Sequence, residues 1–207
     1  MDVARFKKLP VLGIMRGVEH DLIEPLMEAV IDAGLETIEI TMNTGGAAES
    51  IKKARRVAGK RLTIGAGTVI DGKSLKAALD AGASFIVMPV LVKDIVAYCV
   101  KNKIPVFPGA LTPQEIYNAW TSGATMVKVF PSGLLGPAYF KEIKGPFADI
   151  ELLACGGVTP ENIISYFENG ADAIAFGASV FRKDWLAKKD FQAVRDRIKD
   201  YLTAVKK

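Results

Sequence analysis

Residues 123–131 read Gly-Ala-Thr-Met-Val-Lys-Val-Phe-Pro, an apolar and strand-like run with one lysine near its centre. Side chains alternate along a strand, so Val127 and Val129 face one side and Lys128 faces the other. A lysine buried among apolar neighbours is costly unless its charge is satisfied or removed. The structural alternatives to a functional role are an amine that reaches solvent and an amine paired with a buried carboxylate.

The glycine that opens this run belongs to a repeat. Gly-Leu or Gly-Ala pairs stand at positions 34, 82, 123 and 170, about two strand–helix units apart. Each pair is expected to end a helix, because glycine suits the left-handed helix terminus, and to lead into a strand. Strands are predicted over residues 11–15, 37–41, 62–67, 85–89, 105–108, 125–131, 150–154 and 173–176, with helical segments between them. Eight such units predict one domain over residues 1–207, a (β/α)8 TIM barrel of the α/β class.

Two of the helices are predicted to start at a Thr-Pro pair. Thr112-Pro113-Gln114-Glu115 has a threonine N-cap, proline at the first helical position and glutamate at the third, which is a capping box. Thr159-Pro160 is predicted to start the seventh helix in the same way.

Counting from the four glycines gives a register for the even-numbered strands. Four residues on stand the β-branched residues Ile38, Ile86, Val127 and Ile174, which are expected to face the helices. Five residues on stand Glu39, Val87, Lys128 and Ala175, which are expected to share one interior layer. An acid and an amine are therefore predicted inside the barrel, toward the strand ends where barrel enzymes place their chemistry. A structural ion pair is the alternative, although buried ion pairs stabilise poorly compared with apolar packing.

This pair suits nucleophilic chemistry. Burial favours the neutral form of a lysine, which attacks ketones, and a nearby carboxylate can move protons to and from the adduct. The lone histidine, His20, stands near a predicted helix start and is expected at the surface. Histidine triads and His-ligated metal sites are therefore not predicted.

Two glycine-containing loops follow the seventh and eighth predicted strands. Cys155-Gly156-Gly157-Val158 and Phe176-Gly177-Ala178-Ser179 stand where many barrels bind phosphate through backbone amides. A single Gly-Gly pair often marks only a tight turn, but two such loops together favour an anion site.

The bulk composition is that of a soluble globular chain, with 50% hydrophobic and 24% charged residues. The net charge of +4 comes from scattered basic residues without a nucleic-acid-reading motif, so no nucleic-acid partner is predicted. No apolar run reaches membrane-spanning length, and no membrane partner is expected. Cys99 and Cys155 form no metal-spaced pair, which favours a reducing cytoplasm.

Four motifs together resemble a known family. Ile38-Glu39-Ile40-Thr41, Gly65-Ala66-Gly67-Thr68, residues 127–131 and Gly156-Gly157-Val158 are similar, in order, to motifs of the 2-keto-3-deoxy-6-phosphogluconate (KDPG) and 4-hydroxy-2-oxoglutarate (KHG) aldolases. The resemblance covers nearly the whole chain. It implies a class I aldolase without metal or cofactor, on a (β/α)8 barrel, assembled as a homotrimer and acting on a small anionic 2-keto acid.

The resemblance also implies residue roles. Lys128 would form a Schiff base with the keto carbon and Glu39 would be the general acid/base, giving pyruvate and glyceraldehyde 3-phosphate. The substrate carboxylate would be held by Arg16 and Thr68, and the pocket would be lined by Asn43, Pro89, Phe130 and Cys155. The phosphate would be bound at Gly156, Gly157, Gly177, Ala178 and Ser179.

Departures from the family pattern bear on the substrate. Arg16 with Asn43 resembles the branch acting on 2-keto-3-deoxy-6-phosphogalactonate, whereas Ala178 replaces a glycine near the phosphate and could weaken its recognition. Cys155 stands where threonine is frequent and is expected to be a packed thiol rather than a nucleophile. A KHG aldolase releasing glyoxylate, a phosphosugar isomerase or epimerase with Glu39 as base, and a non-catalytic anion-binding barrel remain as alternatives.

Overall fold

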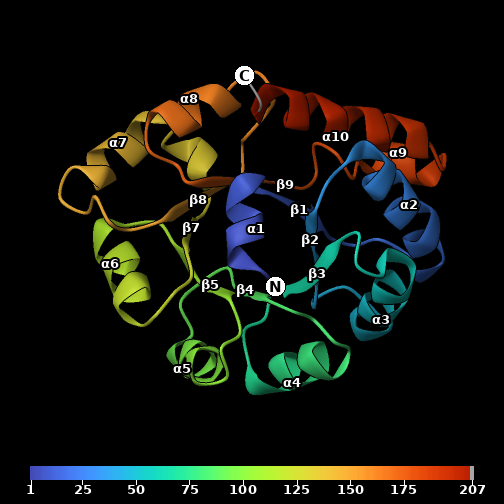
Figure 1. Ribbon diagram of the computed structural model, residues 1–207, viewed down its shortest axis with the longest axis horizontal. Helices are drawn as coiled ribbons and strands as arrows, with labels where there is room; N and C mark the ends of the chain where they lie inside the picture. The colour runs from blue at the N-terminus through green and yellow to red at the C-terminus, as the bar shows by residue number, and fades with distance from the viewer. Residues whose placement is uncertain (206–207) are drawn as a thin grey trace.

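The computed structural model describes residues 1–205, whose strands form a nearly closed parallel barrel surrounded by helices (Figure 1). The elements are α1 (Val3–Lys8), β1 (Val11–Met15), the 3-10 helix η1 (His20–Leu22), α2 (Ile23–Ala33), β2 (Thr37–Thr41), α3 (Ala47–Ala58), β3 (Thr63–Gly67), α4 (Gly72–Asp80), β4 (Ile86–Val87), α5 (Lys93–Lys101), β5 (Val106–Phe107), β6 (Gly109–Ala110), α6 (Pro113–Thr121), β7 (Val127–Val129), the 3-10 helix η2 (Ser132–Leu134), α7 (Ala138–Lys144), β8 (Leu152–Cys155), α8 (Ile163–Glu168), β9 (Ala173–Phe176), α9 (Lys183–Ala187) and α10 (Phe191–Val205). The strand order around the ring is β5-β4-β3-β2-β1-β9-β8-β7-β6. The predicted barrel is confirmed.

The fifth predicted strand is divided into two. β5 pairs with β4, and β6 pairs with β7, so the two short strands together close the ring. Pro108 stands between them and has no N–H to donate, which interrupts the ladder at that point. The prediction of one strand over residues 105–108 was therefore wrong in its extent, although it placed a strand at the right point in the order.

The four glycines of the repeat occupy the predicted left-handed positions. Gly34, Gly82, Gly123 and Gly170 have φ values of 91°, 90°, 98° and 96°, and each follows a helix and precedes a strand. The longest helix, α10, has 15 residues, and within residues 1–205 no helix combines the length and apolarity needed to cross a bilayer.

The two predicted Thr-Pro helix starts differ in outcome. Thr112 caps α6 through a capping box, as predicted. Thr159 does not cap α8, which begins four residues later at Ile163. The side chain of Asn162 accepts the Thr159 N–H at 2.8 Å and donates to the Gly157 carbonyl at 2.9 Å. These side-chain bonds accompany a hydrogen-bonded turn before the helix, in which the Ile163 N–H donates to the Thr159 carbonyl at 3.0 Å.

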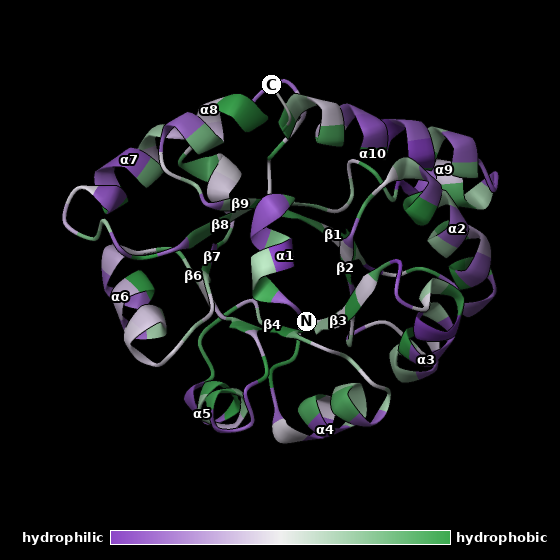
Figure 2. Cartoon of the chain, viewed as in Figure 1, coloured by the Kyte–Doolittle hydropathy of each residue, from purple (hydrophilic) through white to green (hydrophobic). Residues whose placement is uncertain are grey.

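The core has two parts, separated by the strands. The outward residues Ile38, Ile86, Val127 and Ile174 are fully buried beneath the helices. The inward residues Val87 and Ala175 belong instead to a smaller apolar cluster inside the barrel. Figure 2 shows hydrophobic residues along the strands and hydrophilic residues on the outer helices, such as α9 and α10. The register counted from the glycines is thus confirmed.

Helix α1 closes the N-terminal end of the barrel and lies across the centre of the ring in Figure 1. Phe6 packs inside the barrel with its ring centroid 6.0 Å from that of Phe107. The Met1 amine donates to the Ser84 carbonyl, and α1 residues pair with Glu36 and Glu151; all three acceptors belong to residues that stand shortly before a strand. α1 therefore covers the end of the barrel at which the strands begin.

Candidate active site

The predicted site residues gather at the open end of the barrel. Arg16, Thr68 and Gly177 directly follow β1, β3 and β9, and Phe130 and Gly156 directly follow β7 and β8. In a parallel barrel these strand ends lie around one mouth, opposite α1 in this chain.

Glu39 and Lys128 both point into the barrel. Side chains paired in register on neighbouring parallel strands face the same side of a sheet. Glu39 is in register with Ile14, and Lys128 with Leu153; Leu153 belongs to the interior cluster and Ile14 packs against it. Glu39 is fully buried and Lys128 is 4% exposed. The predicted shared interior is therefore present.

The carboxyl group of Glu39 lacks a hydrogen-bond partner on either oxygen among residues 1–205. Burial raises the pKa of Glu39, and the positive charges of Lys128 and Arg16 act in the opposite direction. The carboxyl group has its space because residue 67 is glycine: a Cβ there would lie 2.6 Å from the Glu39 carboxyl carbon. Glu39 can therefore hold a proton at a higher pH than an exposed glutamate can.

The structural ion pair that competed with a functional role is not formed. With no partner on either Glu39 oxygen, Lys128 shares the interior without a direct bond to the acid. The backbone N–H of Lys128 donates to Pro108, and its Nζ lies 5.5 Å from the centroid of the Phe130 ring. Phe130 is 37% exposed, so the ring next to the buried amine also reaches solvent.

Cys155 faces the same interior. It is 3% exposed and belongs to the apolar cluster inside the barrel. Burial raises the pKa of its thiol, with Lys128 acting in the opposite direction and Glu39 adding to the rise. The thiol is kept protonated by its surroundings, in agreement with the packed role expected for it.

Arg16 and Thr68 come together from the ends of β1 and β3, the two strands on either side of β2. The Arg16 Nη2 donates to the Thr68 Oγ1 at 3.3 Å. Thr68 has a φ of 54°, a left-handed backbone that a β-branched residue rarely adopts. Such strain is found where surrounding structure forces a side chain into a required place. The pair presents a guanidinium and a hydroxyl at the mouth, close enough to Glu39 for the Arg16 charge to affect its pKa.

The first glycine loop adjoins the lysine strand. Gly156 and Gly157 have φ values of 88° and 80°, which only glycine adopts freely. A Cβ on Gly156 would lie 3.6 Å from ring carbons of Phe130. Ser132 donates from its Oγ to the Gly156 carbonyl at 2.8 Å. Sequence reasoning missed this contact of Ser132, whose only signal is its place just after the lysine strand.

The second glycine loop is joined to the first through a residue that was not predicted. Gly177 and Ser179 are partly exposed and Ala178 is exposed. The Ser179 Oγ lies 2.8 Å from the Oη of Tyr201 on α10. The Tyr201 hydroxyl also donates to the Val158 carbonyl, in the first glycine loop.

Two predicted pocket residues stand farther out. Asn43 lies exposed in the loop after β2, and Pro89 is partly buried after β4. The Pro89 carbonyl fills the space that a side chain on Gly109 would need. Within residues 1–205 no group of three His, Cys, Asp or Glu side chains is placed to hold a metal ion.

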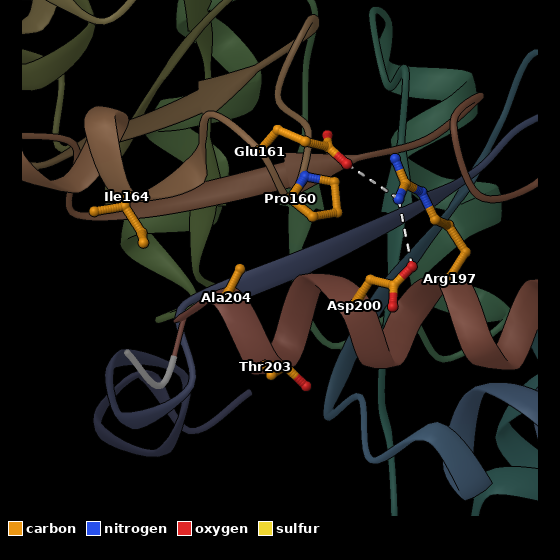
Figure 3. A pocket seen from close by; sticks show the side chains of 7 residues that line it. All are labelled: Pro160, Glu161, Ile164, Arg197, Asp200, Thr203 and Ala204. Atoms are coloured by element: carbon orange, nitrogen blue, oxygen red, sulfur yellow. Dashed lines mark hydrogen bonds and ion pairs between the residues drawn. The ribbon is translucent and has the colours of Figure 1, made fainter.

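A surface groove of about 330 Å³ lies elsewhere, between the segment before α8 and α10 (Figure 3). It is lined by Pro160, Glu161, Ile164, Arg197, Asp200, Thr203 and Ala204. Arg197 pairs there with Glu161 at 3.5 Å and with Asp200 at 3.3 Å. The groove contains none of the predicted site residues.

Comparison with known proteins agrees with the geometry. The sequence model of the family described as KDPG and KHG aldolase matches residues 3–197. The 2-dehydro-3-deoxy-6-phosphogalactonate aldolase of Escherichia coli (strain K12) is 33% identical over 199 residues, covering 96% of this chain and 97% of that enzyme. The 2-dehydro-3-deoxy-phosphogluconate aldolase of Pseudomonas aeruginosa is 37% identical over 161 residues, covering 76% and 70%. A solved structure described as native KDPGal has a TM-score of 0.89 at 32% identity, covering 96% of this chain and 95% of the other. The chain belongs to the KDPG and KHG aldolase family.

Proposed function

We propose that the protein is a class I aldolase that cleaves a 2-keto-3-deoxy-6-phospho sugar acid to pyruvate and glyceraldehyde 3-phosphate. One observation carries the proposal: a lysine and a glutamate are buried in the same barrel interior without pairing to each other. An amine that is not held by a carboxylate is free to attack a ketone, and an unpaired carboxyl group is free to exchange a proton.

The reaction begins with attack of the Lys128 amine on the C2 carbonyl of the substrate. The carbinolamine loses water and becomes a protonated imine. Glu39 takes the proton of the C4 hydroxyl, the C3–C4 bond breaks, and its electron pair moves into the imine to give an enamine. The aldehyde leaves, C3 is protonated, and hydrolysis releases pyruvate and regenerates the amine. The raised pKa of Glu39 suits a group that takes a proton and returns it within one catalytic cycle.

The two ends of the substrate have separate binding groups in this proposal. Arg16 and Thr68 hold the carboxylate beside the Schiff base, and their mutual contact supports this assignment. The backbone at residues 156–157 and 177–179 binds the phosphate, and Ala178 leaves its N–H available there. Phe130 stands between the two regions, with Asn43, Pro89 and Cys155 completing the wall.

The phosphorylated sugar acids are favoured over 4-hydroxy-2-oxoglutarate because two loops converge where a phosphate would lie. The phosphogalactonate and phosphogluconate aldolases among the relatives act on substrates of this class. Cleavage rates on both sugar acids and on 4-hydroxy-2-oxoglutarate decide among them. We place the phosphogalactonate first, since Arg16 and Asn43 match that branch.

Borohydride reduction in the presence of pyruvate tests the mechanism. A stable adduct on the peptide containing Lys128 is expected, and Lys128→Ala is expected to abolish both adduct and cleavage. The matched control Lys76→Ala changes an exposed lysine of α4 and is expected to keep both. An isomerase, an epimerase or a non-catalytic barrel would give no adduct on Lys128.

We extend the proposal to assembly and location. Leu134 and Val90 are 78% and 54% exposed, and a homotrimer would bury such apolar side chains against further copies. Cys99 and Cys155 are both free and buried thiols, which fits a reducing cytoplasm.

A further inference from the structure

A single phenol oxygen connects the two glycine loops. Tyr201 lies on α10 and is fully buried. Its Oη lies 2.8 Å from the carbonyl oxygen of Val158, which follows Gly156-Gly157, and 2.8 Å from the Oγ of Ser179. Sequence position gives no hint of this junction, since Tyr201 is 22 residues beyond Ser179.

The direction of both hydrogen bonds follows from counting protons. A carbonyl oxygen only accepts, so the one phenol proton of Tyr201 goes to Val158. The Ser179 hydroxyl must then donate its own proton to the Tyr201 oxygen. Burial raises the pKa of Tyr201, which keeps the phenol protonated. The Ser179 hydroxyl is therefore occupied as a donor and can offer a proton to an anion only by leaving Tyr201.

Several backbone N–H groups of the same two loops are free to donate. Among residues 1–205 the N–H groups of Gly157, Ala178 and Ser179 donate no hydrogen bond within the protein. The next two N–H groups, of Val180 and Phe181, turn back to the Gly177 carbonyl at 3.0 and 2.9 Å. Free successive N–H groups at a turn of this kind form a concavity that attracts anions.

The tyrosine itself is held from both sides. Its ring centroid lies 4.7 Å from that of Phe176, the last residue of β9. The Arg197 guanidinium carbon lies 5.6 Å from the ring centroid, and Arg197 also pairs with Glu161 in the segment after the first loop (Figure 3). α10 thus fixes the phenol at a defined place beneath both loops.

We propose that Tyr201 is a positioning residue for the phosphate site, and that Ser179 binds phosphate through its backbone N–H rather than its hydroxyl. Tyr201 sets the spacing of the two loops, so that their free N–H groups converge on one phosphate group. This inference rests on the proposed function for the identity of the ligand. It assigns the hydroxyl of Ser179 to the loop junction and not to the substrate.

Three variants test the inference: Tyr201→Phe, Ser179→Ala and the matched control Tyr166→Phe. Tyr166 is a buried tyrosine of α8 whose ring packs on Phe140. The measured quantities are the inhibition constant of inorganic phosphate, the KM of the phosphorylated substrate, and the exchange of pyruvate methyl protons in D2O. The exchange needs the Schiff base but no phosphate.

Tyr201→Phe leaves the Val158 carbonyl without its donor and is expected to raise both phosphate constants about tenfold. Proton exchange is expected to stay within about twofold of wild type, as is every constant of Tyr166→Phe. Ser179→Ala breaks only the Ser179–Tyr201 hydrogen bond, keeps the Tyr201–Val158 bond and removes no phosphate contact. It is therefore expected to change the phosphate constants less than about threefold. The double variant is expected to match Tyr201→Phe, since the serine then has no tyrosine hydroxyl to hold.

A larger loss of phosphate affinity in Ser179→Ala than in Tyr201→Phe would overturn the inference, since the hydroxyl would then be a direct ligand. Ser179→Ala alone decides this point if Tyr201→Phe does not fold. Unchanged phosphate constants in a folded Tyr201→Phe would also overturn it. Failure of the proposed function is a separate result: wild-type protein would then show neither proton exchange nor a borohydride adduct.

Discussion

The substitution Gly67→Ala tests whether the position of the Glu39 carboxyl group matters for turnover. Gly67 ends β3 and is in register with Thr41. Its added Cβ would lie 2.6 Å from the Glu39 carboxyl carbon, whereas ordinary contacts begin at 3.4 Å, so that carbon must retreat by about 0.8 Å. A displacement of about 1 Å in a reacting group can cost about 100-fold in rate.

Gly67→Ala is therefore expected to lower kcat for aldol cleavage about 100-fold, while Lys128 still forms a borohydride-reducible adduct with pyruvate. Overpacking should also lower the free energy of unfolding by about 1–3 kcal/mol. The assay is steady-state release of pyruvate, with urea unfolding of the same samples. Adduct formation separates a misplaced acid from a collapsed site.

Gly65→Ala is the matched control on the same strand. Its added Cβ would meet the Phe85 ring deeper in the barrel. It is expected to lose stability while keeping a kcat within a few-fold of wild type in the folded fraction. The reasoning is refuted by a folded Gly67→Ala protein with wild-type kcat, or by equal kcat losses in the two variants.

Two further predictions concern charge at the mouth. Because burial raises the pKa of Glu39 above 4.5, its contribution to stability is present below pH 4.5 and is lost as the pH rises through the folded-state value. At pH 8, Glu39→Gln is therefore expected to have a higher free energy of unfolding than wild type, by about 1.4 kcal/mol for each pH unit by which the Glu39 pKa is raised. Below pH 4.5 the two proteins are expected to be equally stable in urea unfolding. A variant that is less stable than wild type at pH 8 contradicts this. Arg16→Gln is expected to raise the KM of pyruvate in proton exchange about 10- to 100-fold. It is also expected to move the acidic limb of the pH–rate profile to higher pH, because the Arg16 charge opposes the rise in the Glu39 pKa. An unchanged KM would exclude Arg16 from carboxylate binding.

The direction of side chains along strands could be predicted from the sequence. Ile38 faces the helices and Glu39 the interior because alternation along a strand is a geometric property of the backbone. The glycine repeat set the starting point for that count, since a left-handed helix end requires a residue without a Cβ. These rules act locally and need no knowledge of tertiary contacts.

The features that could not be predicted depend on side-chain geometry or distant contacts. Register placed Glu39 and Lys128 in one interior, but whether they bond depends on side-chain conformations. The Asn162 side chain displaced the predicted start of α8 through bonds that proline and threonine propensities do not describe. Tyr201 was missed because a helical position shows which face is buried, not which loop carbonyl lies beneath it. α1 was missed because one buried apolar residue, Phe6, in six helical residues gives no period to read.

Helix α1 places Met1 at the opposite end of the barrel from the candidate active site. Met1 contacts Ser84 at the end of the ring that α1 covers, while in the proposed mechanism substrate reaches Lys128 from the opposite rim. A surface attachment or fusion partner joined at Met1 would thus leave the rim facing free solution. Immobilised preparations made this way should turn over substrate without a diffusion barrier imposed by the support, provided that the linker leaves Phe6 seated.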